Sequence, residues 1–270
     1  MSYQTITYTC EGAVAVITQN QPERLNPINA QSIGELLDAL AQARADTRVR
    51  ALLMTGNGRV FSSGADLHGN GFAQDRATRG ADIANAIRSL LNPLIAELHE
   101  LPVPVVMALN GAAVGAGVGL ALAGDIILAA RTAYFYLPFI KALGVVPDGG
   151  SSWFLQRRIG SARALALSLT GSRLPAEKAE QWGLIHACIE GEGLQAAAME
   201  MAQQLARLPA HGIVEARRMF DAAEHNDLRT QLEYEAERQG EMFKLPTLDE
   251  GVAAFFGKRA PNFPGRGNPS

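Results

Sequence analysis

Apolar residues follow two patterns along this chain: short unbroken runs, and longer stretches with helical spacing. The short runs predict buried strands at residues 3–9, 13–18, 49–55, 103–109, 126–129, 134–137 and 185–189. The helical spacing predicts helices between them, at residues 29–44, 81–98, 120–123, 149–159, 162–169 and 176–181. After residue 193 only helical patterns follow, at residues 194–208, 211–224, 227–243 and 247–256. Strands mixed with helices, then helices alone, predict an α/β core over residues 1–190 and a helical region over residues 191–270.

The densest run of small residues follows the strand expected at residues 103–109. It reads NGAAVGAGVGLALAGD, from Asn110 to Asp125. A glycine-dense turn that enters a helix leaves backbone N–H groups open to close approach at the positive end of that helix. The run fits neither the dinucleotide-binding glycine pattern, because Leu120 stands at the third glycine position, nor a P-loop, because Asp125 follows Gly124. It can still be an oxyanion site, or the glycines can serve only tight helix–strand packing.

A second strand ends in the same way. The segment Arg59–Leu67, RVFSSGADL, follows the strand expected at residues 49–55, so each of the two loops can offer one N–H to a single oxygen. Residues 68–79 are polar and glycine-rich without a clear period, and we expect them to form a mobile surface loop that acts as a lid.

Composition narrows the classes of function. The 270 residues are 47% apolar, enough for a large core, and the net charge of −3 without a block of Lys or Arg gives no reason to expect nucleic acid or an anionic membrane. The polar start MSYQTITYTCEG, and the lack of an apolar run of about 20 residues, predict a cytoplasmic protein. Two cysteines and five histidines without ligand spacing predict no metal site.

Six segments taken together resemble the crotonase (enoyl-CoA hydratase/isomerase) superfamily. They are Gln21–Asn26, Phe61–Leu67, Asn110–Asp125, Leu143–Gly150, Leu174–Ala179 with Trp182–Ile185, and Phe255–Phe263. The resemblance implies a spiral of ββα units whose C-terminal helices pack in a homotrimer or a dimer of trimers. It also implies an acyl-CoA thioester as the substrate and no further cofactor. Leu143–Gly150, Ala176–Trp182 and Phe255–Arg259 especially resemble the phenylacetate-pathway isomerases of the superfamily, the 2-(1,2-epoxy-1,2-dihydrophenyl)acetyl-CoA isomerase type.

The resemblance also assigns site residues. The backbone N–H groups of Ala65 and Ala116 would hold the thioester oxygen. The neighbouring residues expected to bind substrate are Ser63, Asp66, Leu67 and Gly117. Arg24 and Lys258, which Arg259 follows, are the cations expected at the CoA phosphates; the alternative is that they are ordinary solvated charges.

One carboxylate remains as the expected proton carrier. The two glutamates of the family's hydratases match Gly119 and, within about one residue, Phe139, and neither is acidic. Asp148 lies in Pro-Asp-Gly-Gly, a sequence typical of turns and helix caps, but the isomerases that the segment resembles carry their single carboxylate here. Val145 and Val146 beside it predict lost solvation and a raised pKa, which suits a base that moves a proton between two carbons.

Double-bond isomerisation through an enolate is therefore the leading hypothesis. Hydration by a water held at Asp148 or other polar groups, and acyl-CoA binding without turnover, are the alternatives. Dehalogenation ranks below them, because residues 86–91 and 139–142 lack the His and Trp that such family members use.

Overall fold

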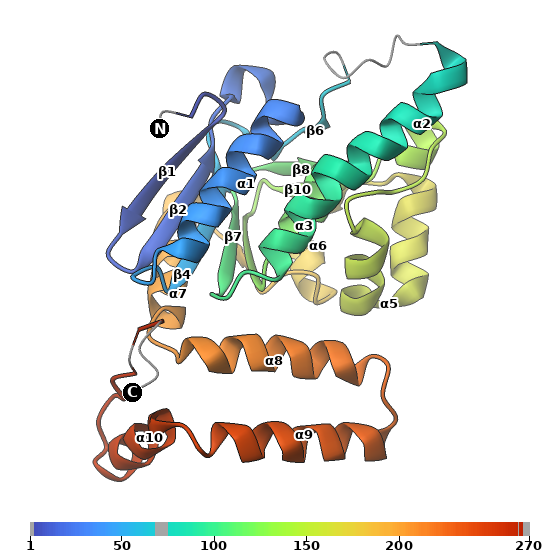
Figure 1. The fold of residues 1–270 in the computed structure, drawn as a ribbon. Coiled ribbons are helices and arrows are strands. Elements are labelled where there is room, and N and C mark those ends of the chain that lie inside the picture. The colour runs from blue at the N-terminus through green and yellow to red at the C-terminus, as the bar shows by residue number, and fades with distance from the viewer. Residues whose placement is uncertain (1–2, 68–74, 264, 267–270) are drawn as a thin grey trace.

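A six-stranded sheet forms the centre of the computed structural model, which describes residues 3–67, 75–263 and 265–266 (Figure 1). The strand order is β1-β2-β4-β7-β9-β12; β1 pairs with β2 in antiparallel fashion, and the later neighbours are parallel. The strands are β1 (Ile6–Glu11), β2 (Val14–Gln19), β4 (Ala51–Gly56), β7 (Val105–Leu109), β9 (Ile126–Ala130) and β12 (Ala187–Ile189). β4 and β7 are buried on both faces, which is why they read as continuous apolar runs.

Three of the central strands are each followed by a short strand of a second sheet. This four-stranded sheet has the order β11-β10-β8-β5. Its strands are β5 (Val60–Ser62), β8 (Ala112–Val114), β10 (Tyr134–Tyr136) and β11 (Leu174–Pro175). A third, two-stranded sheet joins β3 (Pro27–Ile28) to β6 (Gly64–Ala65). The pairs β4–β5, β7–β8 and β9–β10 each precede a helix, so the expected architecture of repeated ββα units is confirmed.

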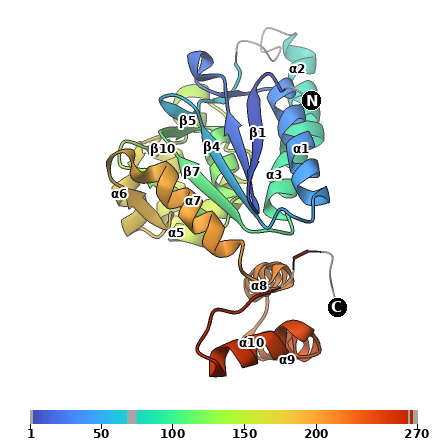
Figure 2. The same cartoon turned by 90° about the vertical axis from the view of Figure 1, so that its left-hand side faces the viewer.

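Helices cover both faces of the central sheet. α1 (Ala30–Ala45) and α3 (Asn92–His99) pack on one face, and α7 (Leu194–Leu205) packs on the other (Figure 2). Successive side chains of a strand point to opposite faces of the sheet. Leu52 therefore packs on the side of α1 and α3, and Leu53 packs on the side of α7. Because α7 packs on the sheet, the helices that leave the core begin with α8 rather than at residue 191. The folding boundary expected at residue 190 stays a prediction.

The helix expected at residues 81–98 begins earlier and is interrupted. Its first part, α2 (Arg76–Ala86), follows Asp75, whose carboxylate accepts the Ala77 N–H at 3.1 Å. A π-helical turn, Ile87–Leu91, joins α2 to α3 just before Pro93, which lacks the N–H of a regular helical hydrogen bond. The loop expected at residues 68–79 was wrong over residues 75–79, which form the cap and first turn of α2, and residues 68–74 lie outside the described residues.

The other helices, apart from the earlier start of α4, follow the sequence pattern more closely. They are α4 (Ala116–Leu122), α5 (Ser151–Thr170), α6 (Ala176–Gln181), α8 (Ala210–Ala223), α9 (Leu228–Met242) and α10 (Pro246–Phe256). α5 joins the two expected segments through a break at Gly160, which has non-helical backbone angles. Figure 1 places α8, α9 and α10 to one side of the core, where Phe220, Phe255 and Phe256 expose about four-fifths of their surface. Within the described residues, no helix has the length and apolar content of a membrane span.

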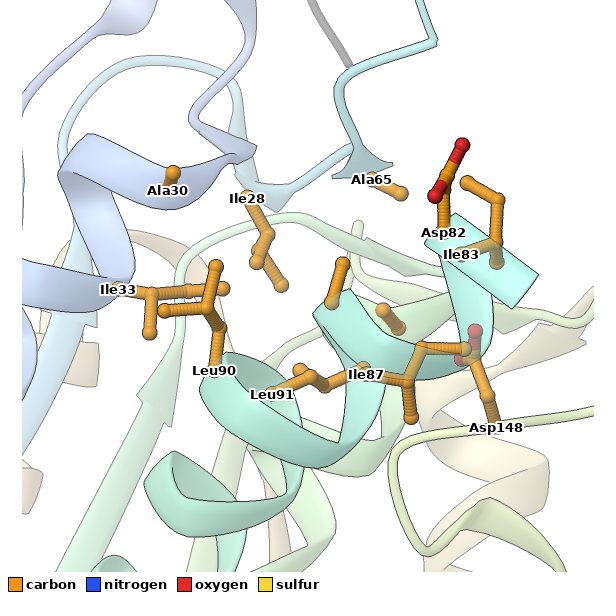
Figure 3. Close-up of a pocket in the computed structure, with 12 residues that line it drawn as sticks. Ile28, Ala30, Ile33, Ala65, Asp82, Ile83, Ile87, Leu90, Leu91 and Asp148 are labelled. Atoms are coloured by element: carbon orange, nitrogen blue, oxygen red, sulfur yellow. The ribbon is translucent and has the colours of Figure 1, made fainter. Parts of the chain in front are cut away.

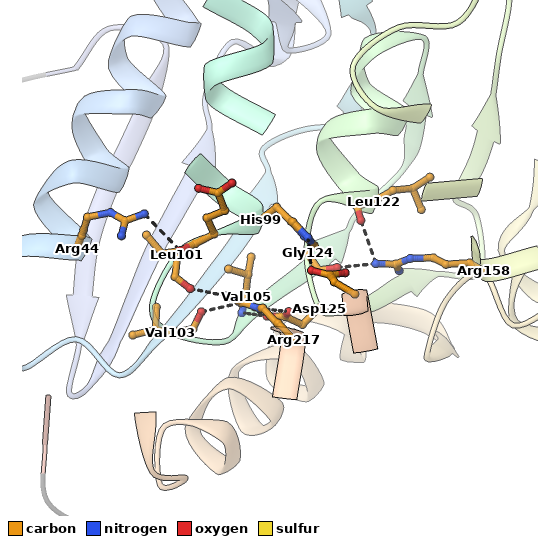
Figure 4. Close-up of polar contacts among 12 residues, drawn as sticks. Arg44, His99, Leu101, Val103, Val105, Leu122, Gly124, Asp125, Arg158 and Arg217 are labelled. Atoms are coloured by element: carbon orange, nitrogen blue, oxygen red, sulfur yellow. Dashed lines mark hydrogen bonds and ion pairs between the residues drawn. The ribbon is translucent and has the colours of Figure 1, made fainter. Parts of the chain in front are cut away.

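Arg217 of α8 fastens this outer helical layer to the core (Figure 4). Its Nε donates to Asp125 Oδ1 at 2.6 Å, and further N–H groups donate to the Leu101 and Val103 carbonyls. Asp125 in turn accepts the Val105 N–H at 2.6 Å, at the first residue of β7. One guanidinium therefore satisfies a mostly buried carboxylate and two backbone acceptors in the connection that enters β7.

We expect Arg217→Ala to lower the free energy of unfolding by about 2–4 kcal/mol, because it leaves Asp125 without its charged partner and two carbonyls without their donor. Arg218→Ala is the matched control on the same helix, since Arg218 is exposed and, within the described residues, its ion-pair partner is Glu215 of its own helix. Its expected cost is below about 0.5 kcal/mol. Urea unfolding of both variants at one protein concentration measures the difference, and equal losses would contradict the role given to Arg217.

Candidate active site

A cavity of about 300 Å³ lies between the start of α1, the α2–π-turn segment, the end of β6 and the first residue of α4 (Figure 3). Ala65, Ala116 and Asp148 all line it. The structure therefore brings together, from three separate segments, the residues expected to hold the thioester oxygen and to carry the proton. Most of the remaining lining is apolar, with Ile28, Ile33, Leu90 and Leu91 on its walls.

Strand pairing orients the Ala65 amide. β6 runs parallel to β3 with Ala65 opposite Ile28, and the Asp66 N–H donates to the Ile28 carbonyl at 3.0 Å. The pairing with β3 thus fixes the backbone of Ala65 at the edge of the cavity.

The Ala116 amide belongs to the first turn of α4. The helix begins at Ala116, four residues before the expected start, after Gly115 with φ 54° and ψ −125°. An N–H at the first helical position has no acceptor within the helix, and it lies at the positive end of the helix dipole. Glycine dominates the approach to this residue because the chain must turn through a positive φ to enter α4.

The two amide-bearing loops are in direct contact. Gly64 has φ +83°, and a Cβ atom built on it would lie 2.5 Å from the Val114 carbonyl oxygen and 3.4 Å from the Ala116 nitrogen. Only glycine fits there without displacing the backbone. The contact places Gly64, the residue before Ala65, against Ala116. The Ala65 and Ala116 amides are therefore close in space, which is necessary if both are to donate to one oxygen.

Asp148 is the acid of the site with an unpaired carboxylate oxygen. Its Oδ1 is buried and has no hydrogen-bond partner among the described residues, and burial raises the pKa of its carboxyl above the ordinary value. The turn suggested by Pro-Asp-Gly-Gly is present, because the Ser151 N–H donates to the Asp148 carbonyl at 3.0 Å. Capping by the carboxylate is absent: Gly150 holds the N-cap position of α5, without a side-chain hydrogen bond. The carboxylate is thus left available to substrate.

Asp82 is a second carboxylate at the cavity that sequence reasoning missed. It comes from α2 and is exposed, so it lies where the cavity opens to solvent. Ile83 of α2 and Ile87 of the π-helical turn line the cavity with it. The signal was available, because residues 82, 83, 86, 87 and 90 share one helical face.

The expected substrate-binding residues lie around the cavity but do not line it. The half-exposed Arg24 is paired with the buried Asp66 at 2.6 Å, so its charge has a partner within the chain. Gly117 packs against Ser62, whose Cβ would lie 2.9 Å from a Cβ at that position. The Ser63 N–H donates to the Leu25 carbonyl at 2.9 Å, and the Leu67 side chain is 45% exposed.

The C-terminal cation pair lies far from the cavity of its own chain. Lys258 is exposed just after α10, in the outer helical layer of Figure 1. Arg259 beside it holds Glu250 through two hydrogen bonds of 2.6 and 2.8 Å. Neither residue lines the cavity.

Comparison with known proteins decides the family. The family model described as enoyl-CoA hydratase/isomerase matches residues 9–266. The chain belongs to this family. Its relatives include the 1,2-epoxyphenylacetyl-CoA isomerase of Escherichia coli, 41% identical over 95% of this chain and 97% of that protein. A Rhodobacter capsulatus protein named as a probable enoyl-CoA hydratase is 40% identical over 98% of this chain and 100% of its own length.

Solved structures of the enoyl-CoA hydratase/isomerase family share the fold. An enoyl-CoA hydratase from Polaromonas has a TM-score of 0.87 at 31% identity, covering 96% of this chain and 99% of that chain. One from Bacillus anthracis also has a TM-score of 0.87, at 27% identity, with the same coverage. The two positions that the resemblance matches to hydratase glutamates hold no acid in this family member, and Phe139 is buried in the core.

Proposed function

We propose that this protein isomerises an acyl-CoA thioester by moving a proton between two carbons through an enolate. The observation that carries the proposal is the part-buried carboxylate of Asp148, whose Oδ1 has no hydrogen-bond partner among the described residues, in the same cavity as Ala65 and Ala116. A carboxylate kept short of hydrogen bonds is costly for folding, so a site that keeps one is a candidate for proton transfer.

The reaction follows from this geometry. The thioester oxygen accepts the N–H groups of Ala65 and Ala116, and the Asp148 carboxylate takes a proton from a carbon of the acyl group. The electron pair of the broken C–H bond moves toward the thioester oxygen as an enolate. The same carboxylate then returns the proton to another carbon, and the double bond shifts. An amide donor of this kind contributes about 2.7–4 kcal/mol, and a positioned base about 10²–10⁴-fold in rate.

The apolar walls favour an apolar acyl group without its own charge. Isoleucine and leucine side chains make up most of the cavity walls, and each gains from contact with hydrocarbon. The similarity to the Escherichia coli isomerase supports an acyl group derived from phenylacetate.

Hydration is the second candidate, and Asp82 is the observation that favours it. Water addition by two carboxylates needs a second acid at the cavity, and Asp82 is the one that lines it beside Asp148. The exposure of Asp82, which leaves its carboxylate solvated, favours isomerisation over this alternative.

A paired assay separates the two reactions and tests the proposal. With a 3-enoyl-CoA we expect absorbance of the conjugated 2-enoyl thioester to appear, and with a 2-enoyl-CoA in water we expect that absorbance to persist. Rapid loss of the conjugated absorbance would support hydration instead. Tight acyl-CoA binding with neither change would identify a binding protein without turnover.

We further propose that the chain assembles as a homotrimer or dimer of trimers through the outer helices. The exposed Phe220, Phe255 and Phe256 support this, because such surfaces are rarely left to solvent. In that assembly Lys258 would serve the CoA phosphates of a neighbouring subunit.

A further inference from the structure

The turn that carries Asp148 rests directly on α4, at Gly119. A Cβ atom at Gly119 would lie 2.0 Å from the Gly149 carbonyl oxygen, 2.7 Å from its carbonyl carbon and 3.1 Å from its Cα. Real Cβ atoms do not approach backbone this closely, so any side chain at residue 119 must displace either the turn or the helix.

The helix is the less movable of the two. Leu120, Ala121 and Leu122 of α4 are fully buried, and Arg158 of α5 donates to the Leu122 and Gly124 carbonyls at 2.9 and 2.7 Å. Displacing α4 would break these hydrogen bonds at its C-terminal end and disrupt the close packing of the core. The turn therefore gives way first.

The turn is also held from its other sides. Gly149 and Gly150 have φ values of +57° and +76°, the arrangement that a turn with two left-handed central residues needs. A Cβ at Gly149 would lie 3.6 Å from the Ala116 carbonyl oxygen, which places this turn against the residue that offers the oxyanion amide. On the outer side, the ring of Phe154 packs on Gly150.

We propose that Gly119 is a positioning residue: its missing side chain lets the Asp148 turn close onto α4 and so fixes the carboxylate relative to the Ala116 amide. The same contact excludes a second carboxylate from residue 119, which restricts the site to chemistry with one buried acid. This inference rests on the proposed role of Asp148 as the base.

Gly119→Ala tests the contact with the smallest possible side chain. The Gly149 carbonyl must retreat by about 1 Å, and a misplacement of that size costs about 100-fold in rate. We expect the turnover number for isomerisation to fall about 100-fold while KM changes less than threefold. Retreat of the turn also hydrates Asp148, so the acid limb of the pH–rate profile should move to lower pH, a change that general loss of stability would not produce.

The matched control is Gly34→Ala in α1, where an added Cβ meets nothing within 4 Å. Its activity should equal that of the parent. Should Gly119→Ala fail to fold, Gly150→Ala moves the same turn from the opposite side, because its Cβ would lie 2.8 Å from the Phe154 ring. The same fall in turnover and the same shift of the acid limb are expected.

Asp148→Asn in the same assays separates the two claims. Loss of activity in Asp148→Asn, together with parental turnover and an unshifted pH profile in whichever glycine variant folds, overturns the positioning role alone. Full activity in Asp148→Asn overturns the proposed base, and the role of Gly119 with it.

Discussion

Asp148→Asn is expected to lower the turnover number for isomerisation by about 10²–10⁴-fold. The amide has nearly the same shape as the carboxylate but cannot accept a proton from carbon. The cavity and the amides of Ala65 and Ala116 stay in place, so KM should change only a few-fold. Initial rates with a 3-enoyl-CoA measure the effect.

Asp82→Asn is the control, because it removes the other carboxylate that lines the cavity. We expect it to keep at least a third of the parent rate, since Asp82 is solvated at the opening. Similar large losses in both variants would point to two-carboxylate chemistry, and parental activity in Asp148→Asn would show that Asp148 is not the base.

The raised pKa of Asp148 leads to two further expectations, one for the pH dependence of the rate and one for the stability of the fold. Isomerisation should decline as pH falls through that pKa, at a higher pH than for a solvated aspartate. Because the folded-state pKa lies above the unfolded-state value, the carboxyl lowers stability as pH rises between the two. Asp148→Asn should therefore melt at a higher temperature than the parent at neutral pH. This difference in melting temperature should shrink at pH values below the pKa of an ordinary aspartate. A residue retained as a helix cap would show the opposite change.

Ala116→Pro should lower kcat/KM by about 10²–10³-fold, the effect of removing one oxyanion donor. Proline removes the N–H of Ala116, and the first position of a helix is where proline is best tolerated. The fold should therefore survive while one of the two donors to the thioester oxygen disappears. Steady-state kinetics beside thermal melting measure both effects.

The chain offers a matched control in Ala210→Pro. Ala210 is the first residue of α8, far from the cavity, and the residue before it has ψ 123°, which suits a following proline. Its activity should stay within twofold of the parent. If Ala116→Pro folds and keeps parental kcat/KM, the Ala116 amide does not hold the thioester oxygen.

Long apolar runs made most of the core predictable from the sequence. The strands expected at residues 49–55 and 103–109 match β4 and β7, because strands buried on both faces carry little else. The short strands β5 and β8 were missed, since three residues beside glycines leave no period to detect. α4 was expected to begin at residue 120 because its first turn consists of small residues, whose helical state depends on packing rather than propensity.

The site could be predicted from the sequence only in part. Ala65, Ala116 and Asp148 were assigned through the resemblance to a family, and the structure places all three at one cavity. The contact of Gly119 with Gly149 joins segments distant in sequence, and no local pattern encodes it. Asp82 lay on a readable helical face, but a single acid there resembles any solvated charge.

A crystal structure with a bound, unreactive acyl-CoA analogue tests the central claim most directly. The account predicts the thioester oxygen within 2.7–3.1 Å of both the Ala65 and Ala116 nitrogens, with the Asp148 carboxylate facing the carbons that exchange the proton. A thioester oxygen bound away from these two amides, or an Asp148 carboxylate turned away from the acyl group, would contradict it.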